Sequence, residues 1–315
     1  IKAFLSLGGN FVRATPDSQR LEPAWSKLRL TVQIVTKLNR SALVHGEKAY
    51  ILPCLGRTEI DNQASGPQYH TTEDSTACIR AWQGVVKPGG EHLHSEPAII
   101  AALAKATLAP DPRMDWDAWV ADYGLIRDAI AITYPDIFHD FNTRMLEPGG
   151  FHRPLPASWR EWSTDSGKAN FTRPDSLALN DDVEQSPERR DVLNLMTIRS
   201  NDQFNTTVYG YDDRFRGVYG TRSVLFMHRN DMARLGLSES DQVQANTAVD
   251  DGVQRSVGPL RVTPHDIPEG CCAAYYPECN ALVPLWHHEE KAKVPASKSI
   301  PVTLRPFIAT TRALQ

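Results

Sequence analysis

Few residues in this chain have the types and spacing of a catalytic or metal-binding motif. His287, His288, Glu289 and Glu290 bring metal-ligand side chains together, but adjacent residues on a strand point to opposite faces. No HExxH or Cys-x-x-Cys pattern supplies a partner for them. We therefore expect a solvated, charged turn at this position and no metal site.

Neither the cysteines nor the one acidic, hydroxyl-rich segment has the pattern of a catalytic or metal-binding motif. The five cysteines are odd in number and scattered, without Fe–S or zinc spacing: Cys54, Cys78, Cys271, Cys272 and Cys279. That pattern predicts small buried thiols in a reducing compartment, so the cytoplasm is the expected location. His70–Ser75 is more typical of a capped helix start than of a general base. With no nucleophile–base pair, the catalytic residues stay unknown.

The Gly8-Gly9-Asn10 turn follows an apolar run, Ile1–Leu7. Glycines allow backbone N–H groups to approach an anion at the start of a helix. The turn does not match GxGxxG, so a plain tight turn and a cofactor contact both remain open.

The elements around this turn predict an α/β region. Apolar, β-branched runs separated by helical lengths suggest a doubly wound parallel sheet, with buried strands at 1–7, 30–36 and 49–55 and a helix from 16 to 28. A long loop covers 57–72. Ser95 is the expected N-cap of a helix with Pro97 in its first turn, and a second helix runs from Asp115 to Tyr134.

The second half of the chain has a different sequence pattern. Residues 147–190 form what we expect to be a packed connector with scattered aromatic residues. From Asp191 six short β-like runs follow, which fit a barrel or sandwich: VLNLMTI, SVLFMH, QVQANTAV, GPLRVTP, CCAAYY and PVTLRP. A short helix is expected at Arg229–Leu235, capped by Asn230 or Asp231.

Composition narrows the function classes. At 315 residues, with a net charge of −4, the chain has no basic footprint for nucleic acid. No apolar run is long enough to span a bilayer, so we expect no membrane partner. Because the chain starts at Ile1 inside an apparent strand, we expect a fragment of a longer protein.

Four motifs resemble, in order, the molybdopterin-dinucleotide-binding domain of the formate dehydrogenase and dimethyl-sulfoxide reductase superfamily. They are LNLMTIRSNDQFNTT from Leu193, SVLFMHRNDMARLGLSESDQVQ with the later VTPHDIPEG, YPECNAL from Tyr276, and PASKSIPV from Pro295. In the first half, SLGGNFVRATPD and AYILPCLGRTEID resemble the preceding domain. TTEDS, NTTVYG and YDDRFRG are similar to the formate-dehydrogenase-like alpha subunits.

This resemblance implies the C-terminal part of a molybdenum oxidoreductase. The implied fold is a Rossmann-like α/β domain (1–110, part of a discontinuous domain), a helical and irregular connector (111–190) and a double-psi β-barrel (191–315). The implied cofactor is bis(molybdopterin guanine dinucleotide) with molybdenum. Amide, hydroxyl and cationic side chains suit its pyrophosphate and ring edges. The expected cofactor-binding residues are Gly9, Asn10, Asn39, Arg199, Asn201, Gln203, Asn205, Thr206, Asn280 and Lys298.

The resemblance leaves the chemistry outside this chain. The molybdenum ligand and any Fe–S cluster would belong to a missing N-terminal half, which is the first expected partner. A small substrate and an electron-transfer partner are the others. We expect the chain by itself to be inactive. Ala49-Tyr50 and Thr36 replace acidic residues of many relatives, which puts guanosine contacts there in doubt. A non-enzymatic module that uses the barrel for recognition is the alternative.

Overall fold

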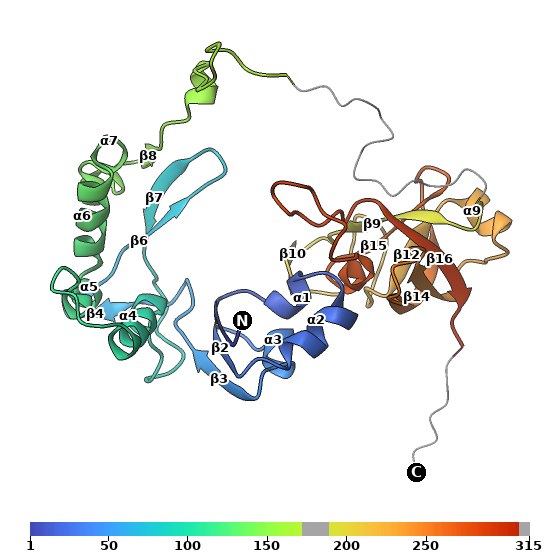
Figure 1. The fold of residues 1–315 in the computed structure, drawn as a ribbon, viewed down its shortest axis with the longest axis horizontal. Helices are drawn as coiled ribbons and strands as arrows, with labels where there is room; N and C mark the ends of the chain where they lie inside the picture. The colour runs from blue at the N-terminus through green and yellow to red at the C-terminus, as the bar shows by residue number, and fades with distance from the viewer. Residues whose placement is uncertain (172–188, 309–315) are drawn as a thin grey trace. The chain divides into compact units, whose positions relative to one another are not determined.

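The computed structural model describes residues 1–171 and 189–308. The chain divides into two compact units (Figure 1). The first contains Ile1–Gln33, Leu38–Tyr50 and residues 189–308; the second contains Ile34–Lys37 and residues 51–171. The first unit therefore holds every residue predicted to contact a cofactor. The domain boundaries at 110 and 190 stay a prediction.

The N-terminal region alternates strands and helices, as its sequence pattern predicts. Its elements are β1 (Ala3–Leu7), α1 (Phe11–Ala14), α2 (Ser18–Trp25), β2 (Leu30–Val35), α3 (Arg40–Leu43) and β3 (Lys48–Pro53). The strands form a parallel sheet in the order β1-β2-β3. Val12, Trp25 and Leu28 form a buried cluster against which Phe4 packs. This small α/β layer places the turn after β1 at the start of α1.

The predictions that the first and third strands are buried are wrong, since β3 contains no buried residue and β1 only one. Leu5 and Leu7 are each 51% exposed, and Ser6 is the one buried residue of β1. Side chains alternate along a strand, so Phe4 and Ser6 share one face and Leu5 and Leu7 share the other. Phe4 packs on the helical cluster, whereas the described chain leaves the opposite face open.

The C-terminal region is a closed, six-stranded barrel. Its strands are β9 (Leu193–Ile198), β12 (Val224–Met227), β13 (Gln242–Thr247), β14 (Ser256–Pro264), β15 (Cys271–Tyr275) and β16 (Ile300–Pro306), in the order β12-β14-β13-β16-β9-β15. All six predicted β runs are thus confirmed, and the barrel is favoured over the sandwich. The β12/β14 and β15/β9 pairs are parallel, while the other pairs are antiparallel. The double-psi and Rossmann-like assignments stay predictions.

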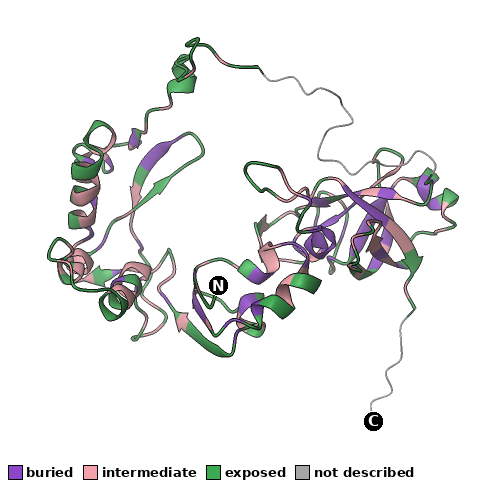
Figure 2. Cartoon of the chain, viewed as in Figure 1, coloured by how far each residue is buried: buried purple, intermediate pink, exposed green. Residues whose placement is uncertain are grey.

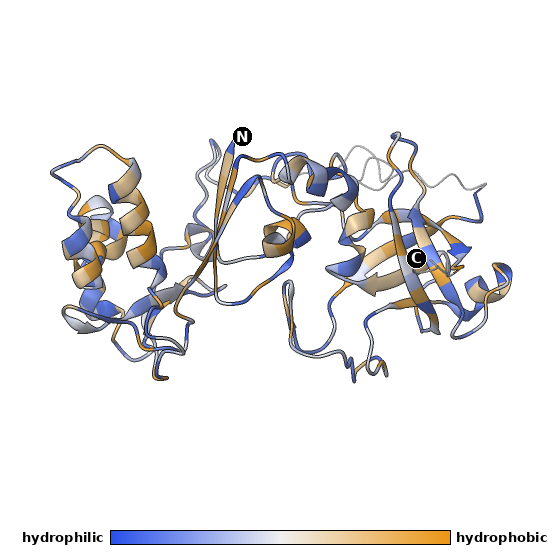
Figure 3. Cartoon of the chain, turned by 90° about the horizontal axis from the view of Figure 1, so that it is seen from below, coloured by the Kyte–Doolittle hydropathy of each residue, from blue (hydrophilic) through white to orange (hydrophobic). Residues whose placement is uncertain are grey.

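The barrel interior is apolar and closely packed. Leu193, Leu195, Val243, Val262 and Val302 are all 0% exposed. Figure 2 shows buried residues gathered along these strands, and Figure 3 shows hydrophobic residues along the same strands and on helices of the second unit. Such a core is rigid, so the loops between strands have fixed starting points.

Short elements lie between the strands of the barrel along the chain. They are the hairpin β10 (Gln203–Phe204) and β11 (Thr207–Val208), helix α9 (Arg229–Arg234) and the 3₁₀ helix η3 (Glu278–Leu282). Helix α9 lies where the sequence predicts it, but its N-cap is His228, whose ring accepts the N–H of Asn230. The prediction of Asn230 or Asp231 as the cap is therefore wrong.

The second unit contains small sheets and helices. Its strands are β4 (Asn62–Gln63), β5 (Gly66–Pro67), β6 (His70–Glu73), β7 (Cys78–Trp82) and β8 (Phe151–His152). Its helices are α4 (Glu96–Thr107), α5 (Trp116–Ala121), α6 (Tyr123–Thr133), α7 (Pro135–Phe138), α8 (Phe141–Arg144) and the 3₁₀ helix η1 (Pro156–Trp159). Ser95 caps α4 by accepting the Ala98 N–H, as predicted.

Three local predictions in this unit are wrong. The segment His70–Ser75 is strand β6 and a turn, because Asp74 accepts N–H groups of the chain ahead instead of capping a helix. The expected long helix breaks at Asp122, which caps α6. The connector is packed only at its start, where Phe151 is buried against Phe141, whereas Trp159 is 61% and Phe171 97% exposed; its residues 172–188 lie outside the described part.

Candidate anion-binding site

The turn after β1 has the geometry that its glycines predict. Gly8 and Gly9 have φ values of 64° and 72°, in the left-handed region that glycine adopts without strain. A Cβ on Gly9 would meet no atom within 4 Å. Asn10 is the N-cap residue of α1, and its Oδ1 is buried without a hydrogen-bond partner in the described chain. An open backbone surface and an unsatisfied amide oxygen therefore lie side by side.

Asn39 holds this turn in place. Its Nδ2 donates to the Gly9 carbonyl at 2.9 Å, and its Oδ1 accepts the Ser41 N–H at 2.9 Å. The structure thus brings Gly9, Asn10 and Asn39 together. Asn39 supports the turn, because both ends of its amide are already engaged.

Arg199 and Lys298 form a second group, on the barrel. Burial lowers the pKa of Lys298, and the neighbouring charge of Arg199 lowers it further. Lys298 Nζ donates to the Thr197 carbonyl. Neither cation has a salt bridge to an acid among residues 1–171 and 189–308. Two like charges in proximity disfavour each other, and a bound anion would relieve that cost.

Tyr276 connects this pair to Arg13 of α1. Burial raises the pKa of Tyr276, while the charges of Arg199 and Arg13 oppose the increase. Arg13 therefore contributes to the same electrostatic environment, although the sequence analysis did not select it. It also lines a hollow of about 460 Å³ between the N-terminal helices and the barrel. We call Arg13, Arg199, Tyr276 and Lys298 the cation cluster.

Gln203 is part of the wall of this cluster. Its Nε2 donates to the Tyr276 carbonyl at 2.6 Å, and its Oε1 accepts from Ser200 and Arg222. The Arg222 guanidinium also pairs with Glu278 at 2.7 Å. Glu278, the carboxylate nearest in sequence to Tyr276, is thereby neutralised by Arg222 and not by the cation cluster. Gln203 acts here as a structural residue.

Asn280 joins the barrel to the N-terminal layer. The side chain is 3% exposed, and its Nδ2 donates to the Ala14 carbonyl at 2.8 Å and to the Arg13 carbonyl at 3.4 Å. Since these carbonyls end α1, the amide fixes the helix that carries Arg13. Asn280 is therefore an internal structural contact between the barrel and α1, and we call these two hydrogen bonds the clamp.

The remaining predicted residues lie around the β10–β11 hairpin. Asn205 is exposed, has a φ of 51°, and gives its carbonyl to the Gln203 amide. Asn201 and Thr206 are half-buried. Neither Asn201 nor Thr206 forms a side-chain hydrogen bond with the cation cluster within the described residues, so the cofactor contacts of the three residues stay predictions.

A buried ion network beside the site escaped the sequence analysis. The Arg255 guanidinium is 0% exposed and donates to Asp17 at 2.7 Å and to Asp251 at 2.8 Å. Asp17, before α2, is also 0% exposed. Asp251 in turn accepts the Trp286 indole N–H at 2.8 Å. Asp17 and Arg255 are 238 positions apart, so no local pattern could have paired them.

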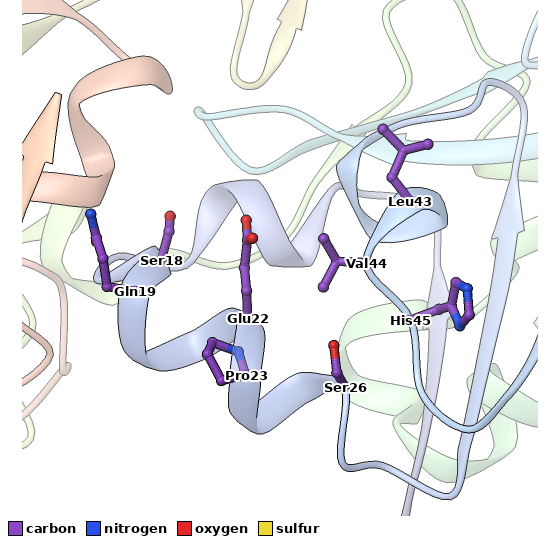
Figure 4. Close-up of a pocket in the computed structure, with 8 residues that line it drawn as sticks. All are labelled: Ser18, Gln19, Glu22, Pro23, Ser26, Leu43, Val44 and His45. Carbon is purple, nitrogen blue, oxygen red and sulfur yellow. The ribbon is translucent and has the colours of Figure 1, made fainter. Parts of the chain in front are cut away.

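A second hollow, of about 570 Å³, lies between α2 and the end of α3 (Figure 4). Its lining has one carboxylate, Glu22, and one imidazole, His45, with no lysine or arginine. Glu22 is already paired with Arg40 at 2.7 Å. This hollow lacks the charge that a phosphate requires.

The second unit has a buried polar cluster of its own. The Asp61 carboxylate accepts from the Tyr123 hydroxyl at 2.7 Å and from the Gln63 amide at 2.6 Å, and His70 Nε2 lies 3.3 Å away. Burial alone would raise the pKa of Asp61, but hydrogen bonds, the largest from His70, lower it. Both carboxylate oxygens are therefore satisfied from within the unit.

Two expected motifs can be placed directly. His287 is buried at 4% exposure, so the prediction of a fully solvated turn at 287–290 is wrong for that residue. Cys54, Cys78, Cys272 and Cys279 are buried, and all five cysteines are free. The described residues include no group of three or more His, Cys, Asp or Glu side chains suited to a metal. In the same residues, no helix is long and apolar enough to cross a membrane.

The barrel matches a known family. Residues 193–301 match the family described as "Molydopterin dinucleotide binding domain". Protein YdeP of Escherichia coli is 41% identical over 307 residues, which cover 97% of this chain and 40% of that protein. A protein named as an uncharacterized oxidoreductase of Mycobacterium bovis is 41% identical over 311 residues, which cover 97% of this chain and 39% of that protein.

The fold is also found in a solved structure. Acetylene hydratase from Pelobacter acetylenicus superimposes with a TM-score of 0.61 at 15% identity, over 97% of this chain and 44% of that one. The resemblance to the C-terminal part of a molybdopterin oxidoreductase is thereby confirmed. This chain spans about two fifths of the length of the curated relatives.

Proposed function

We propose that this chain is the cofactor-binding portion of a formate-dehydrogenase-like oxidoreductase that uses bis(molybdopterin guanine dinucleotide). In this proposal a Rossmann-like layer and a double-psi barrel hold the cofactor, and the whole protein carries out two-electron redox chemistry on a small substrate in the cytoplasm. The rest of the polypeptide supplies the molybdenum ligand and any Fe–S cluster. An electron-transfer partner completes the system.

The cation cluster carries this proposal. The charges of Arg13 and Arg199 both act on Tyr276, and the charge of Arg199 also acts on Lys298, so three cations from separate segments are linked through Arg199. A dinucleotide pyrophosphate is an anion that arginine and lysine bind through charge-assisted hydrogen bonds. Arg199 and Lys298 are exposed and have no acidic partner in the described chain, so both charges are accessible to a phosphate.

Other residues suit the rest of such a cofactor. The unpartnered Asn10 Oδ1 offers an acceptor for a ring N–H, and the open Gly9 backbone permits close approach of a flat group. Asn201, Asn205 and Thr206 add amide and hydroxyl groups on the hairpin side. When bound, the cofactor would supply the molybdenum centre that exchanges two electrons, while these residues would bind and orient it.

The experiment is metal and pterin analysis of the full-length protein purified from a host that makes the cofactor. We expect molybdenum and two pterins per polypeptide, with guanine released on hydrolysis. A protein without molybdenum and pterin would instead support the alternative, a recognition module without redox chemistry. A cytosine in place of guanine would correct only the identity of the nucleotide.

A further inference from the structure

One segment of the barrel exposes an unusual amount of aromatic surface. Between residues 204 and 219, five aromatic side chains are at least 63% exposed: Phe204 76%, Tyr209 70%, Tyr211 66%, Phe215 79% and Tyr219 63%. Aromatic side chains of this size expose on the order of 700 Å² together. Exposed apolar side chains on an ordinary monomer are mostly scattered singly, so five exposed rings within sixteen positions of one segment point to a partner.

The hairpin directs two of these rings outward. Phe204 pairs with Thr207, and Gln203 pairs with Val208. Gln203 faces the barrel, where its amide donates to the Tyr276 carbonyl. Because side chains alternate along a strand, Phe204 lies on the opposite face. The Tyr209 N–H donates to the Asp202 carbonyl, which extends the pairing and places Tyr209 on the Phe204 face.

The following turn is anchored, so its exposure is not the result of looseness. Asp213 and Val218 exchange backbone hydrogen bonds of 2.7 and 3.1 Å. Both residues are buried, and the Asp213 carboxylate accepts from the Tyr275 hydroxyl at 2.7 Å and from Arg216 at 2.6 Å. Phe215 lies at the tip of this turn, with the Arg214 guanidinium 5.3 Å from its ring centre.

We propose that this aromatic surface, Phe204 to Tyr219, packs against the additional polypeptide by which the relatives exceed this chain. The matched residues are 39–40% of those relatives, so most of their length needs a surface to pack on. Aromatic residues and arginine are enriched at protein interfaces, and this segment combines five rings with Arg214 and Arg216. Asp202, Asp212 and Asp213 balance its arginines, so a folded polypeptide fits it better than a polyanion.

The proposal extends the proposed function, because it names the surface by which the cofactor-binding portion meets the rest of the oxidoreductase. The two can fail separately. A polypeptide can cover the aromatic surface whether or not pterin is bound, and pterin can bind the cation cluster whether or not the aromatic surface is covered.

Hydroxyl-radical footprinting provides the test, because it reads phenylalanine and tyrosine rings individually. The samples are the 315-residue chain alone and the full-length protein, the latter prepared both with cofactor and from a host that cannot make it. Tyr275, which is 1% exposed, is the buried reference, and Tyr134, which is 57% exposed in the second unit, is the exposed one. Pterin content is measured on each sample.

We expect the five rings to react readily in the chain alone and to fall towards the rate of Tyr275 in the full-length protein, with or without cofactor. Unchanged reactivity in the full-length protein would overturn the proposal. Protection that requires bound pterin would assign the surface to the cofactor instead. Protection in the chain alone that increases with concentration would assign it to a second copy.

A matched pair of variants gives a second measurement. F204S/F215S removes two outward rings without touching Gln203 or Asp213, and L38S/L43S removes two exposed leucines elsewhere in the first unit. Neither pair should change the melting temperature of the chain alone. In the full-length protein F204S/F215S should lower it and L38S/L43S should not; equal effects would contradict the proposal.

Discussion

Two sets of cations in the first unit differ in what surrounds them. Arg255 is fully buried between the carboxylates of Asp17 and Asp251, whereas Arg199 and Lys298 are exposed residues with no acidic partner in the described chain. A buried cation without acids would be too costly to keep. An exposed pair of cations without acidic partners costs little free energy, and it stays available to bind an anion. The difference indicates that the Arg255 network stabilises the fold and that the cation cluster binds an anion.

The largest expected effect is on stability, from Arg255→Met. The substitution leaves two carboxylates without their shared partner, and we expect the free energy of unfolding to fall by about 3–5 kcal/mol. Urea denaturation followed by circular dichroism measures it. Arg305→Met, on the exposed end of β16, should stay within about 0.5 kcal/mol. If Arg255→Met is too unstable to purify, Arg255→Lys retains the charge and should show a smaller loss.

The next effect is on binding. Arg199→Ala with Lys298→Ala removes two charge-assisted contacts, each worth about 1.5–3 kcal/mol, and should weaken binding of guanosine diphosphate by at least about tenfold. Calorimetric titration of the chain measures it. Arg229→Ala with Lys291→Ala removes the same charges elsewhere on the barrel. If both double variants weakened binding equally, the contribution of the cation cluster would be a nonspecific effect of charge.

Asn280→Ala tests whether the clamp, which fixes α1, is needed for anion binding by the cation cluster. It removes the hydrogen bond to the Ala14 carbonyl and should cost about 1 kcal/mol of stability. Because α1 carries Arg13, binding of guanosine diphosphate should also weaken, but less than in the Arg199/Lys298 variant. Asn246→Ala, on a half-buried asparagine of β13 with no expected cofactor contact, is the control for the loss of an amide. A stability loss with unchanged affinity would show that Arg13 does not need the clamp.

The smallest effect is a pH dependence. Burial and Arg199 lower the pKa of Lys298, so its charge is lost at a lower pH than that of an ordinary lysine. The affinity for guanosine diphosphate should therefore decline by a few-fold as pH rises, beginning at a lower pH than the titration of an ordinary lysine would give. Arg199→Ala should move the decline to higher pH, because it removes one cause of the lowered pKa. A pH profile that is unchanged in Lys298→Ala would assign the decline to another group.

Much of the local structure followed from the sequence. Ser95 caps α4 because a serine before Glu96 and Pro97 satisfies the first N–H groups of a helix. The six β runs became the six barrel strands, since alternating or continuous apolar residues need a core on at least one face. Two predictions failed on competing local chemistry: Asp74 accepts N–H groups in a turn after β6, and Asp122 caps α6 in the middle of the expected helix.

The candidate site followed from the sequence only in part. Gly9, Asn10 and Asn39 lie together because both segments follow neighbouring parallel strands, and their contact with a cofactor stays a prediction. The amide nitrogens of Asn280 and Gln203 donate to carbonyls of the protein itself, and the predicted contacts of these residues with a cofactor stay predictions. Arg13 and Tyr276 were not predicted, because nothing in their neighbourhoods distinguishes them from ordinary surface and barrel residues.

The sequence by itself determined most elements, the glycine turn and the resemblance to the molybdopterin-dinucleotide-binding domain, since these depend on residues within a few positions of one another or on motifs in order. Only the tertiary structure decided which charges are neutralised. Asp17 meets Arg255 across 238 positions, and Arg13 joins Arg199 near Tyr276, because the N-terminal helices dock on the barrel. Electrostatic interactions depend on distance in space, and only the folded chain defines that distance.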